Sequence, residues 1–282
     1  MIATAATEFR CLDYLHSSHM TTPFDNSEQI ARVKSGAISE LGQHITGFAL
    51  QFAEPVIIGT VPTRGKETTL NNATATLLRI ASREFAVTCA HVLQEFRNKR
   101  DVDERKFVFQ VGMLGVNPED QLVGYDEVLD LAVLEITGLR HAHASSRPRN
   151  GPFQFHEPHR WPPAIASDRE VVSIAGYPGA WRQPLSDDHI TFDTFSIGAQ
   201  PVTSSQRNSL ALQFNREHWV SSFGDRGKDI KLLGGMSGGP IMVMRPLNWD
   251  LAGIITHFSE DWDVLFGAPT LRIRADGTID PE

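Results

Sequence analysis

Residues 234–241 read Gly-Gly-Met-Ser-Gly-Gly-Pro-Ile, so that a serine surrounded by glycines stands directly before an apolar run. Glycine on either side lets another backbone approach closely, and it lets the chain turn so that several N–H groups point at one spot. Converging N–H groups are what a developing oxyanion needs. Ser237 is therefore a candidate nucleophile, although the segment taken alone is also compatible with an ordinary loop.

Two other segments place a reactive side chain beside apolar residues: Val87-Thr-Cys-Ala-His91-Val-Leu and Asp130-Leu-Ala-Val-Leu. A serine hydroxyl is a weak nucleophile without a base, and an imidazole base needs a third group to orient it. His91 and Asp130 are candidates for these two roles. Each segment alone has a structural interpretation, but the three together favour catalysis. Asp126 is a rival acid, which we expect to be a turn residue instead.

These segments resemble the motifs Thr-Ala-Ala-His, Asp-[Ile/Leu]-Ala-[Leu/Val] and Gly-[Asp/Asn]-Ser-Gly-Gly-Pro of the chymotrypsin-like (trypsin-like) serine peptidases, at residues 88–91, 130–133 and 235–240. The order His, Asp, Ser is that of this family. The resemblance extends over about residues 46–275 and is closest in style to bacterial intracellular members. It implies a serine endopeptidase that needs no cofactor and no metal and that cleaves a protein or peptide substrate.

The resemblance also implies a role for each site residue. Ser237 would attack the scissile carbonyl, His91 would act as general base and then general acid, and Asp130 would orient the imidazole. The oxyanion hole would consist of the N–H groups of Gly235 and Ser237. Thr256 matches a position whose hydroxyl commonly supports the aspartate in this family.

The substrate pocket is expected near Lys231, Thr256, His257 and Phe258. Lys231 stands six residues before the serine. A cation there would favour an acidic substrate side chain, while the alternative is an exposed loop lysine. His257 and Phe258 would instead narrow the pocket toward small residues.

Met236 occupies the place where secreted relatives carry an aspartate that pairs with a new N-terminus. A thioether cannot pair with an ammonium group. We therefore expect apolar packing of Met236 to shape the oxyanion loop, with no N-terminal cleavage required.

The same residues have two other interpretations: a different hydrolase fold and a non-catalytic protein. The segment Gly235-Met-Ser-Gly-Gly239 also fits the G-x-S-x-G turn of α/β-hydrolases, but that fold needs its acid and histidine after the serine, and alternating strands and helices are missing there. A trypsin-like fold that is catalytically silent and acts as a protein-binding module remains the alternative.

The rest of the chain from Ile45 onward consists of short β-type runs separated by turn residues, which predicts an all-β protein. The expected architecture is two six-stranded antiparallel β-barrels: an N-terminal extension at 1–45, a first barrel at 46–145, a linker at 146–165 and a second barrel at 166–282. The one helix expected between strands covers 91–99. Expected strands are 47–52, 75–80, 84–88, 107–114, 130–136, 171–175, 191–197, 209–214, 240–244, 251–256 and 270–273.

Composition limits the partners. The 282 residues carry a formal charge of −8, which argues against nucleic acid binding. No apolar run has the length of a membrane span, and the N-terminus lacks the features of a secretory signal. With two cysteines, Cys11 and Cys89, we expect a reducing, cytoplasmic location. The N-terminal extension has room for a partner that the sequence does not identify.

Two remaining groups of residues have competing interpretations. His141, His143, His156 and His159 have spacings that suit zinc, but the proline-rich surroundings favour a solvated linker. Cys89 is expected to be buried as a small apolar residue that points away from His91.

Overall fold

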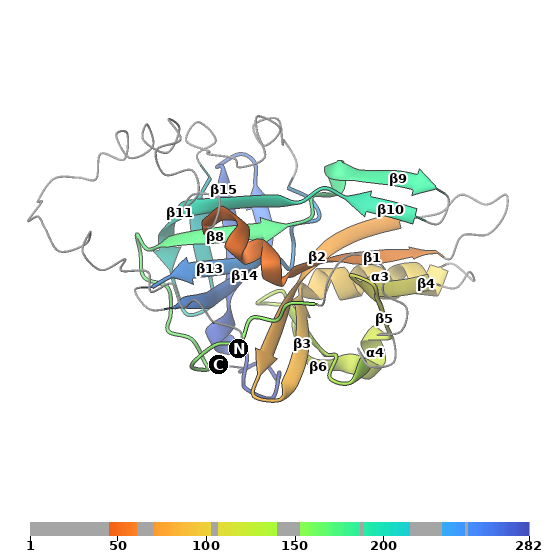
Figure 1. Ribbon diagram of the computed structural model, residues 1–282, viewed down its shortest axis with the longest axis horizontal. Coiled ribbons are helices and arrows are strands. Elements are labelled where there is room, and N and C mark those ends of the chain that lie inside the picture. Colours follow the sequence, from red (N-terminus) through yellow and green to blue (C-terminus); the bar gives the residue numbers. More distant parts are fainter. Residues whose placement is uncertain are drawn as a thin grey trace, which may run out of the picture.

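The computed structural model describes residues 45–60, 70–102, 107–139, 153–186, 189–214, 233–245 and 248–281. Two sheets lie side by side in it, with the closed one drawn in green and blue and the open one mainly in orange and yellow (Figure 1). Within these ranges no helix has the length and apolar character needed to cross a membrane. Of the expected extension at 1–45, residues 1–44 lie outside the described residues.

The first sheet curls around its own core. In the described ranges it has seven strands in the order β5-β4-β1-β2-β3-β7-β6, and all neighbouring pairs are antiparallel. The strands are β1 (Ala53–Thr60), β2 (Leu70–Ile80), β3 (Arg83–Thr88), β4 (Phe107–Val111), β5 (Leu114–Val116), β6 (Leu122–Asp126) and β7 (Leu131–Glu135), with helices α3 (Ala90–Val102) and α4 (Pro118–Gln121).

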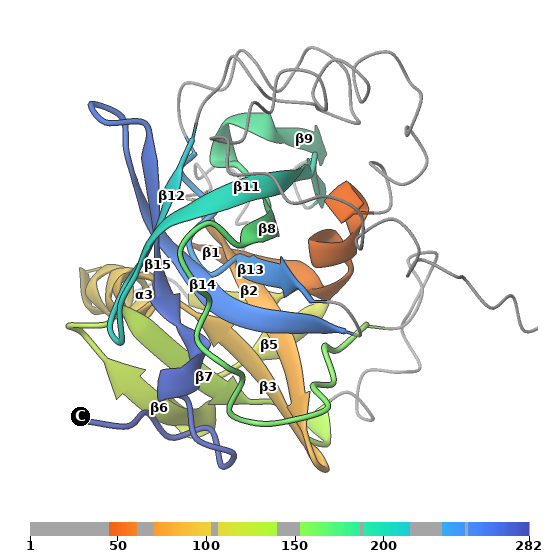
Figure 2. The same cartoon turned by 90° about the vertical axis from the view of Figure 1, so that its left-hand side faces the viewer.

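The second sheet closes into a barrel. Six strands of the described chain form it, in the order β11-β12-β15-β14-β13-β8. They are β8 (Val171–Gly176), β11 (Phe195–Ser205), β12 (Leu210–Gln213), β13 (Pro240–Met244), β14 (Trp249–Ser259) and β15 (Val264–Pro269), and a separate hairpin consists of β9 (Arg182–Ser186) and β10 (His189–Phe192). Figure 2 shows β14 and β15 as a long hairpin.

Strand β2 is buried on both faces, because one face contributes to the core of the first sheet and the other packs against the second barrel. Ala73, Ala75 and Leu77 point into the core of the first sheet, and successive side chains of a strand alternate between faces. Leu78 accordingly belongs to a second core that the two sheets share, together with Met242 and other residues of the barrel. The alternate positions Thr74 and Thr76 are thereby directed toward the barrel.

The fold prediction is confirmed as a chymotrypsin-like double barrel, with corrections to individual elements. The second barrel has the expected six strands, whereas the first unit is an open sheet of seven described strands and not a six-stranded barrel. The expected helix at 91–99 is present within α3. Strands β1, β6, β9 and β15 were not foreseen.

Two predicted strands are wrong. Residues 47–52 are helical. Phe48 and Phe52 are four positions apart and therefore share one face of the helix. Their rings pack edge to face there, with 5.3 Å between the centroids. Residues 270–273 contain the 3-10 turn Thr270–Arg272 in place of a strand.

The solvated-linker interpretation is wrong for His156. This residue is only 5% exposed, and it forms an isolated bridge with Leu78, with hydrogen bonds of 2.9 Å from His156 N to Leu77 O and from Arg79 N to His156 O. The ring packs edge to face on Phe52. The prolines around the segment thus did not prevent it from pairing with β2. His141 and His143 lie outside the described residues.

Candidate active site

The three candidate catalytic residues stand at the ends of strands where the two sheets meet. His91 is the second residue of α3, which follows β3 almost directly. Asp130 immediately precedes β7. Because β3 and β7 are paired, with Thr88 opposite Ala132, His91 and Asp130 meet at one edge of the first sheet. Ser237 lies in the turn before β13 of the second barrel.

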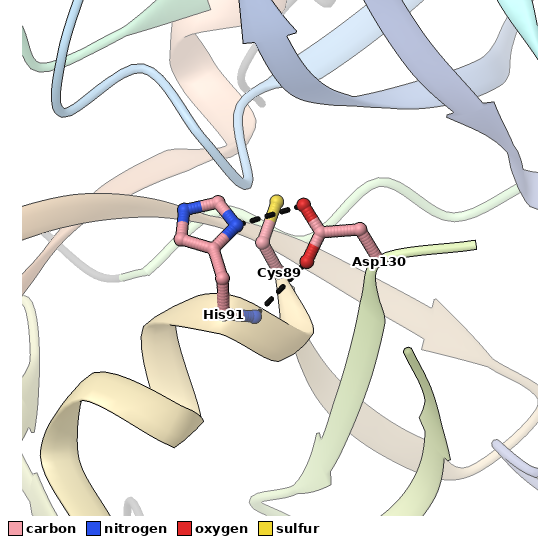
Figure 3. Close-up of side chains that lie close together, drawn as sticks. All are labelled: Cys89, His91 and Asp130. Carbon is pink, nitrogen blue, oxygen red and sulfur yellow. Dashed lines mark hydrogen bonds and ion pairs between the residues drawn. The ribbon is translucent and has the colours of Figure 1, made fainter. Parts of the chain in front are cut away.

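Asp130 contacts His91 through both carboxylate oxygens (Figure 3). Oδ2 lies 2.7 Å from Nδ1 of the ring, and Oδ1 accepts the backbone N–H of His91 at 2.9 Å. That N–H belongs to the first turn of α3, where backbone donors lack helical partners. Asp130 also has a φ of 55°, a left-handed conformation that aspartate and asparagine adopt more readily than most residues. The carboxylate therefore orients the ring and caps the helix.

The environment favours a positive charge on His91. The hydrogen bond to Asp130 raises the pKa of His91 above 6.5, desolvation opposes the rise, and the negative charges of Asp130 and Glu95 add to it. The His91 side chain is 51% exposed. A base in this position stays accessible to a substrate while one ring nitrogen is held by the carboxylate.

Ser237 and His91 line the same pocket, which has a volume of about 240 Å³. The Ser237 hydroxyl donates to the carbonyl of Thr256 at 3.0 Å. Among the hydrogen bonds of the described residues there is none between Ser237 and His91. The remaining walls are mostly apolar and are formed by Leu233, Gly234, Met236, Ile255, Thr256, His257, Phe258, Glu260 and Leu265.

Glycine is required at two positions of the loop that carries Ser237. Gly235 has φ 96° and Gly238 has φ 94°, values that favour glycine. A Cβ on Gly235 would lie 2.6 Å from the carbonyl oxygen of Tyr177, and one on Gly238 would collide with the carbonyl oxygen of Thr74. The Gly-rich motif is therefore explained by close packing as well as by backbone conformation.

Three of the four predicted pocket residues line the pocket. Thr256, His257 and Phe258 all line the pocket, whereas Lys231 lies outside the described residues. The Thr256 hydroxyl is 3.2 Å from Nδ1 of His257, and among the hydrogen bonds of the described residues none joins it to Asp130, unlike the expected support. Glu260 also lines the pocket; nothing in the sequence singled it out, because it belongs to the hairpin after β14.

Met236 is 1% exposed and packs in the core of the second barrel. A Cβ on Gly176 of β8 would come within 2.8 Å of the Met236 sulfur, so the thioether fits closely against that strand. The side chain before Ser237 therefore points into the barrel core, where an aspartate would be a buried charge.

The prediction that Cys89 points away from His91 is wrong, although its burial is confirmed. Figure 3 shows the thiol beside the His91–Asp130 pair, and the donor atoms of the three side chains lie within 4.8 Å of one another. The thiol also lies 3.2 Å from the carbonyl oxygen of Ile255. The fully buried thiol has a pKa raised mainly by desolvation and further by Asp130.

Among the described residues, this trio is the one group of three or more His, Cys, Asp or Glu side chains whose ligand atoms lie close enough together to hold a metal ion. Its chemistry does not fit a metal, because a metal needs the thiolate and the environment of Cys89 opposes thiolate formation. In addition, Nδ1 of His91 and Oδ2 of Asp130 are already joined at 2.7 Å. The arrangement is suited to proton transfer at His91.

Comparison with known proteins identifies the family of the chain. A family model described as "Trypsin-like peptidase domain" matches residues 74–253, a range that contains all three candidate catalytic residues. No curated protein sequence matches the chain.

Solved structures with a similar chain path include serine proteases. The thermostable serine protease AL20 from an extremophilic microorganism has a TM-score of 0.42 and 14% identity, with 78% of this chain and 91% of that chain covered. The serine protease domain of the Sesbania mosaic virus polyprotein has a TM-score of 0.39 and 15% identity, with 79% and 96% covered.

Proposed function

The chain belongs to the trypsin-like peptidase domain family, and on that basis we propose that it is a serine endopeptidase that hydrolyses peptide bonds through an acyl-enzyme. Ser237 is the nucleophile, His91 the general base and acid, and Asp130 the residue that orients His91. The substrate is a protein or peptide.

The observation that supports this proposal best is the hydrogen bond between Asp130 and His91, the histidine that lines the same pocket as Ser237. With Nδ1 donating to the Asp130 carboxylate, a neutral imidazole carries its lone pair on Nε2. That nitrogen is the one available to accept the serine proton. The Asp130 charge also stabilises the imidazolium that forms.

In the first step, the Ser237 Oγ attacks the substrate carbonyl carbon, and its proton passes to Nε2 of His91. The carbonyl oxygen becomes an oxyanion, which the N–H groups of Gly235 and Ser237 would stabilise. The imidazolium then protonates the leaving amine as the C–N bond breaks. Water then attacks the acyl carbonyl carbon while His91 accepts its proton. His91 returns that proton to the Ser237 Oγ as the acyl–oxygen bond breaks and the carboxylic acid product leaves.

The attack requires a rotation of the serine side chain. In the structure its hydroxyl donates to Thr256 O at 3.0 Å, so the Oγ must turn toward His91 when substrate binds. Catalytic hydrogen bonds are often long or misaligned before substrate is bound and shorten in the complex. If the hydroxyl stayed on Thr256, the protein would be a catalytically silent binding module, which is the second candidate function.

A fluorophosphonate probe separates the two functions. We expect stoichiometric labelling of Ser237 in the wild type, loss of labelling in Ser237→Ala, and loss of most turnover of casein or a peptide ester in His91→Ala. A wild type that binds peptides but is never labelled would favour the silent module. Circular dichroism of each variant checks that the fold is intact.

Asp130→Asn is the matched test of the orienting role. Asparagine tolerates the left-handed φ of this position and keeps one oxygen acceptor, so the fold should persist. It cannot accept from both His91 donors, and the imidazole is then held in the wrong tautomer. We expect kcat to fall by about 10⁴-fold, as in the same change in a related triad. Unchanged kcat would contradict the role of Asp130.

A further inference from the structure

Strand β2 of the first sheet holds the loop that carries the nucleophile of the second barrel. Two of its threonines, here called the threonine pair, make the contacts. Thr74 donates its backbone N–H to Ser237 O at 2.9 Å and its hydroxyl to Gly235 O at 2.7 Å. Thr76 donates its hydroxyl to Gly238 O at 2.8 Å. Both side chains are completely buried, which limits the access of water to their hydroxyl groups.

As a consequence, the carbonyl groups of five successive residues in the loop are all occupied. Thr74 binds two of them and Thr76 one, as described above. The two others accept backbone N–H groups: Gly234 O from Gly179 at 2.7 Å, and Met236 O from Gly239 at 2.9 Å. A trans peptide has its C=O and N–H on opposite sides. Rotating any of these peptides would therefore break a hydrogen bond.

The same loop leaves two donors for a ligand. The N–H of Met236 donates to Leu233 O at 3.0 Å, and that of Gly238 donates to Ile255 O at 2.8 Å. Gly235 and Ser237 donate no backbone hydrogen bond within the described ranges. These are the two groups required to bind the oxyanion in the proposed mechanism.

Thr74 also forms hydrogen bonds with residues outside the loop. Its hydroxyl oxygen accepts the N–H of Tyr177 at 3.0 Å while donating to Gly235. Its carbonyl accepts the Thr88 hydroxyl at 2.8 Å. One buried hydroxyl thus connects strand β2, the residue after β8 and the nucleophile loop. Losing it would leave the N–H of Tyr177 and the carbonyl of Gly235, both partly buried, without these hydrogen bonds, which destabilises the contact between the strand and the loop.

We propose that Thr74 and Thr76 are positioning residues that preset the oxyanion hole of this peptidase. The threonine pair does so from the first sheet, so the loop geometry depends on neither an ion pair nor a new N-terminus. This inference rests on the proposed function, because it assigns the free N–H groups to the oxyanion.

The test compares Thr74→Val and Thr76→Val, which remove a hydroxyl and nearly conserve shape, with Thr74→Ser, which keeps the hydroxyl. Thr270→Val is the matched control: Thr270 is equally buried and donates its hydroxyl to the Leu251 carbonyl, away from the loop. The measurements are kcat and KM for a peptide ester, the rate of fluorophosphonate labelling, and hydrogen exchange of the amides of residues 235–239.

Oxyanion contacts strengthen in the transition state, so their loss lowers kcat and leaves KM nearly unchanged. Because the valine variants disturb the N–H groups indirectly, we expect kcat of Thr74→Val to fall about 10–100-fold, less than removal of a whole donor usually costs. Loop amides should exchange faster. Thr74→Ser should stay near the wild type, and Thr270→Val should change neither kcat nor loop exchange.

Equal kcat and equal loop exchange in Thr74→Val and Thr270→Val would overturn the inference, as would a change confined to KM. If Thr74→Val does not fold, Thr76→Val decides by the same criteria. If the wild type is not labelled at all, the proposed function fails. In that case the oxyanion assignment fails with it, and loop exchange alone shows whether the threonine pair orders the loop.

Discussion

Acid should destabilise this protein through His156, a histidine held neutral inside the fold. Burial lowers the pKa of His156 from 6.5 to about 4. The Nε2 atom is buried and has no hydrogen-bond partner among the described residues, and the ring packs at 5.3 Å between centroids on Phe52. As the pH falls below 6.5, the unfolded chain binds a proton at this residue before the folded chain does. The stability associated with neutral His156 is present above pH 6.5 and is lost between pH 6.5 and about 4.

The size of the effect follows from the two pKa values. The difference between 6.5 and about 4, at 1.36 kcal/mol for each pKa unit, corresponds to about 3 kcal/mol when the loss is complete. At pH 5 the folded chain is still mostly unprotonated at His156, so the loss of stability is incomplete. Relative to pH 8 it amounts to about 2 kcal/mol. A domain with a typical stability of about 5–15 kcal/mol would lose a sizeable fraction of it.

Urea unfolding followed by tryptophan fluorescence measures the free energy of unfolding at pH 8 and pH 5. We expect the wild type to lose about 2 kcal/mol more between these pH values than His156→Leu, which has nothing to protonate. His159→Leu changes an exposed histidine of the same segment and should retain the wild-type difference. An equal loss in the wild type and in His156→Leu would refute the assignment of the acid sensitivity to His156.

Three further predictions concern the site. The pKa of His91 is raised, so kcat/KM should fall with decreasing pH around a midpoint above 6.5. Glu95→Gln removes a negative charge that raises this pKa and should move the midpoint lower. A profile that is flat to pH 5 would contradict the role of His91. Gly238→Ala should reduce the free energy of unfolding by about 3 kcal/mol, through strain and the collision with Thr74, and a urea midpoint equal to the wild type would contradict this. In a Cys11→Ser background, the buried Cys89 thiol should react with a colourimetric disulfide reagent only on unfolding, and rapid reaction of the native protein would show that the sheets separate.

Much of the candidate site could be inferred from the sequence, because its local geometry depends on nearby residues. Glycines on both sides of Ser237 indicate backbone conformations that other residues avoid, and the structure has positive φ at Gly235 and Gly238. Asp126 was expected to be a turn residue, and its Oδ1 accepts the N–H groups of Val128 and Leu129 at 2.8 Å. Such interactions span only a few positions, so a motif carries the information.

The contacts that the sequence could not predict join residues far apart in the chain. Thr74 and Gly235 are 161 positions apart, and Cys89 and Ile255 are 166 apart. Neither threonine of the pair stands in a recognisable motif, because a threonine in a strand is common for its β-propensity alone. The burial of His156 was missed for the same reason, since proline-rich composition indicates a loop but not what the loop packs against.

The sequence by itself determined the fold family, the order of His91, Asp130 and Ser237, and the need for glycine around the serine, since each depends on local conformation and on the types of neighbouring residues. Only the tertiary structure decided which side of His91 the Cys89 thiol occupies, which groups hold the nucleophile loop, and that the first sheet is open with seven described strands. The physical reason is that the face on which a side chain lies follows from strand alternation, while the residue that it contacts there depends on how the two sheets pack against each other.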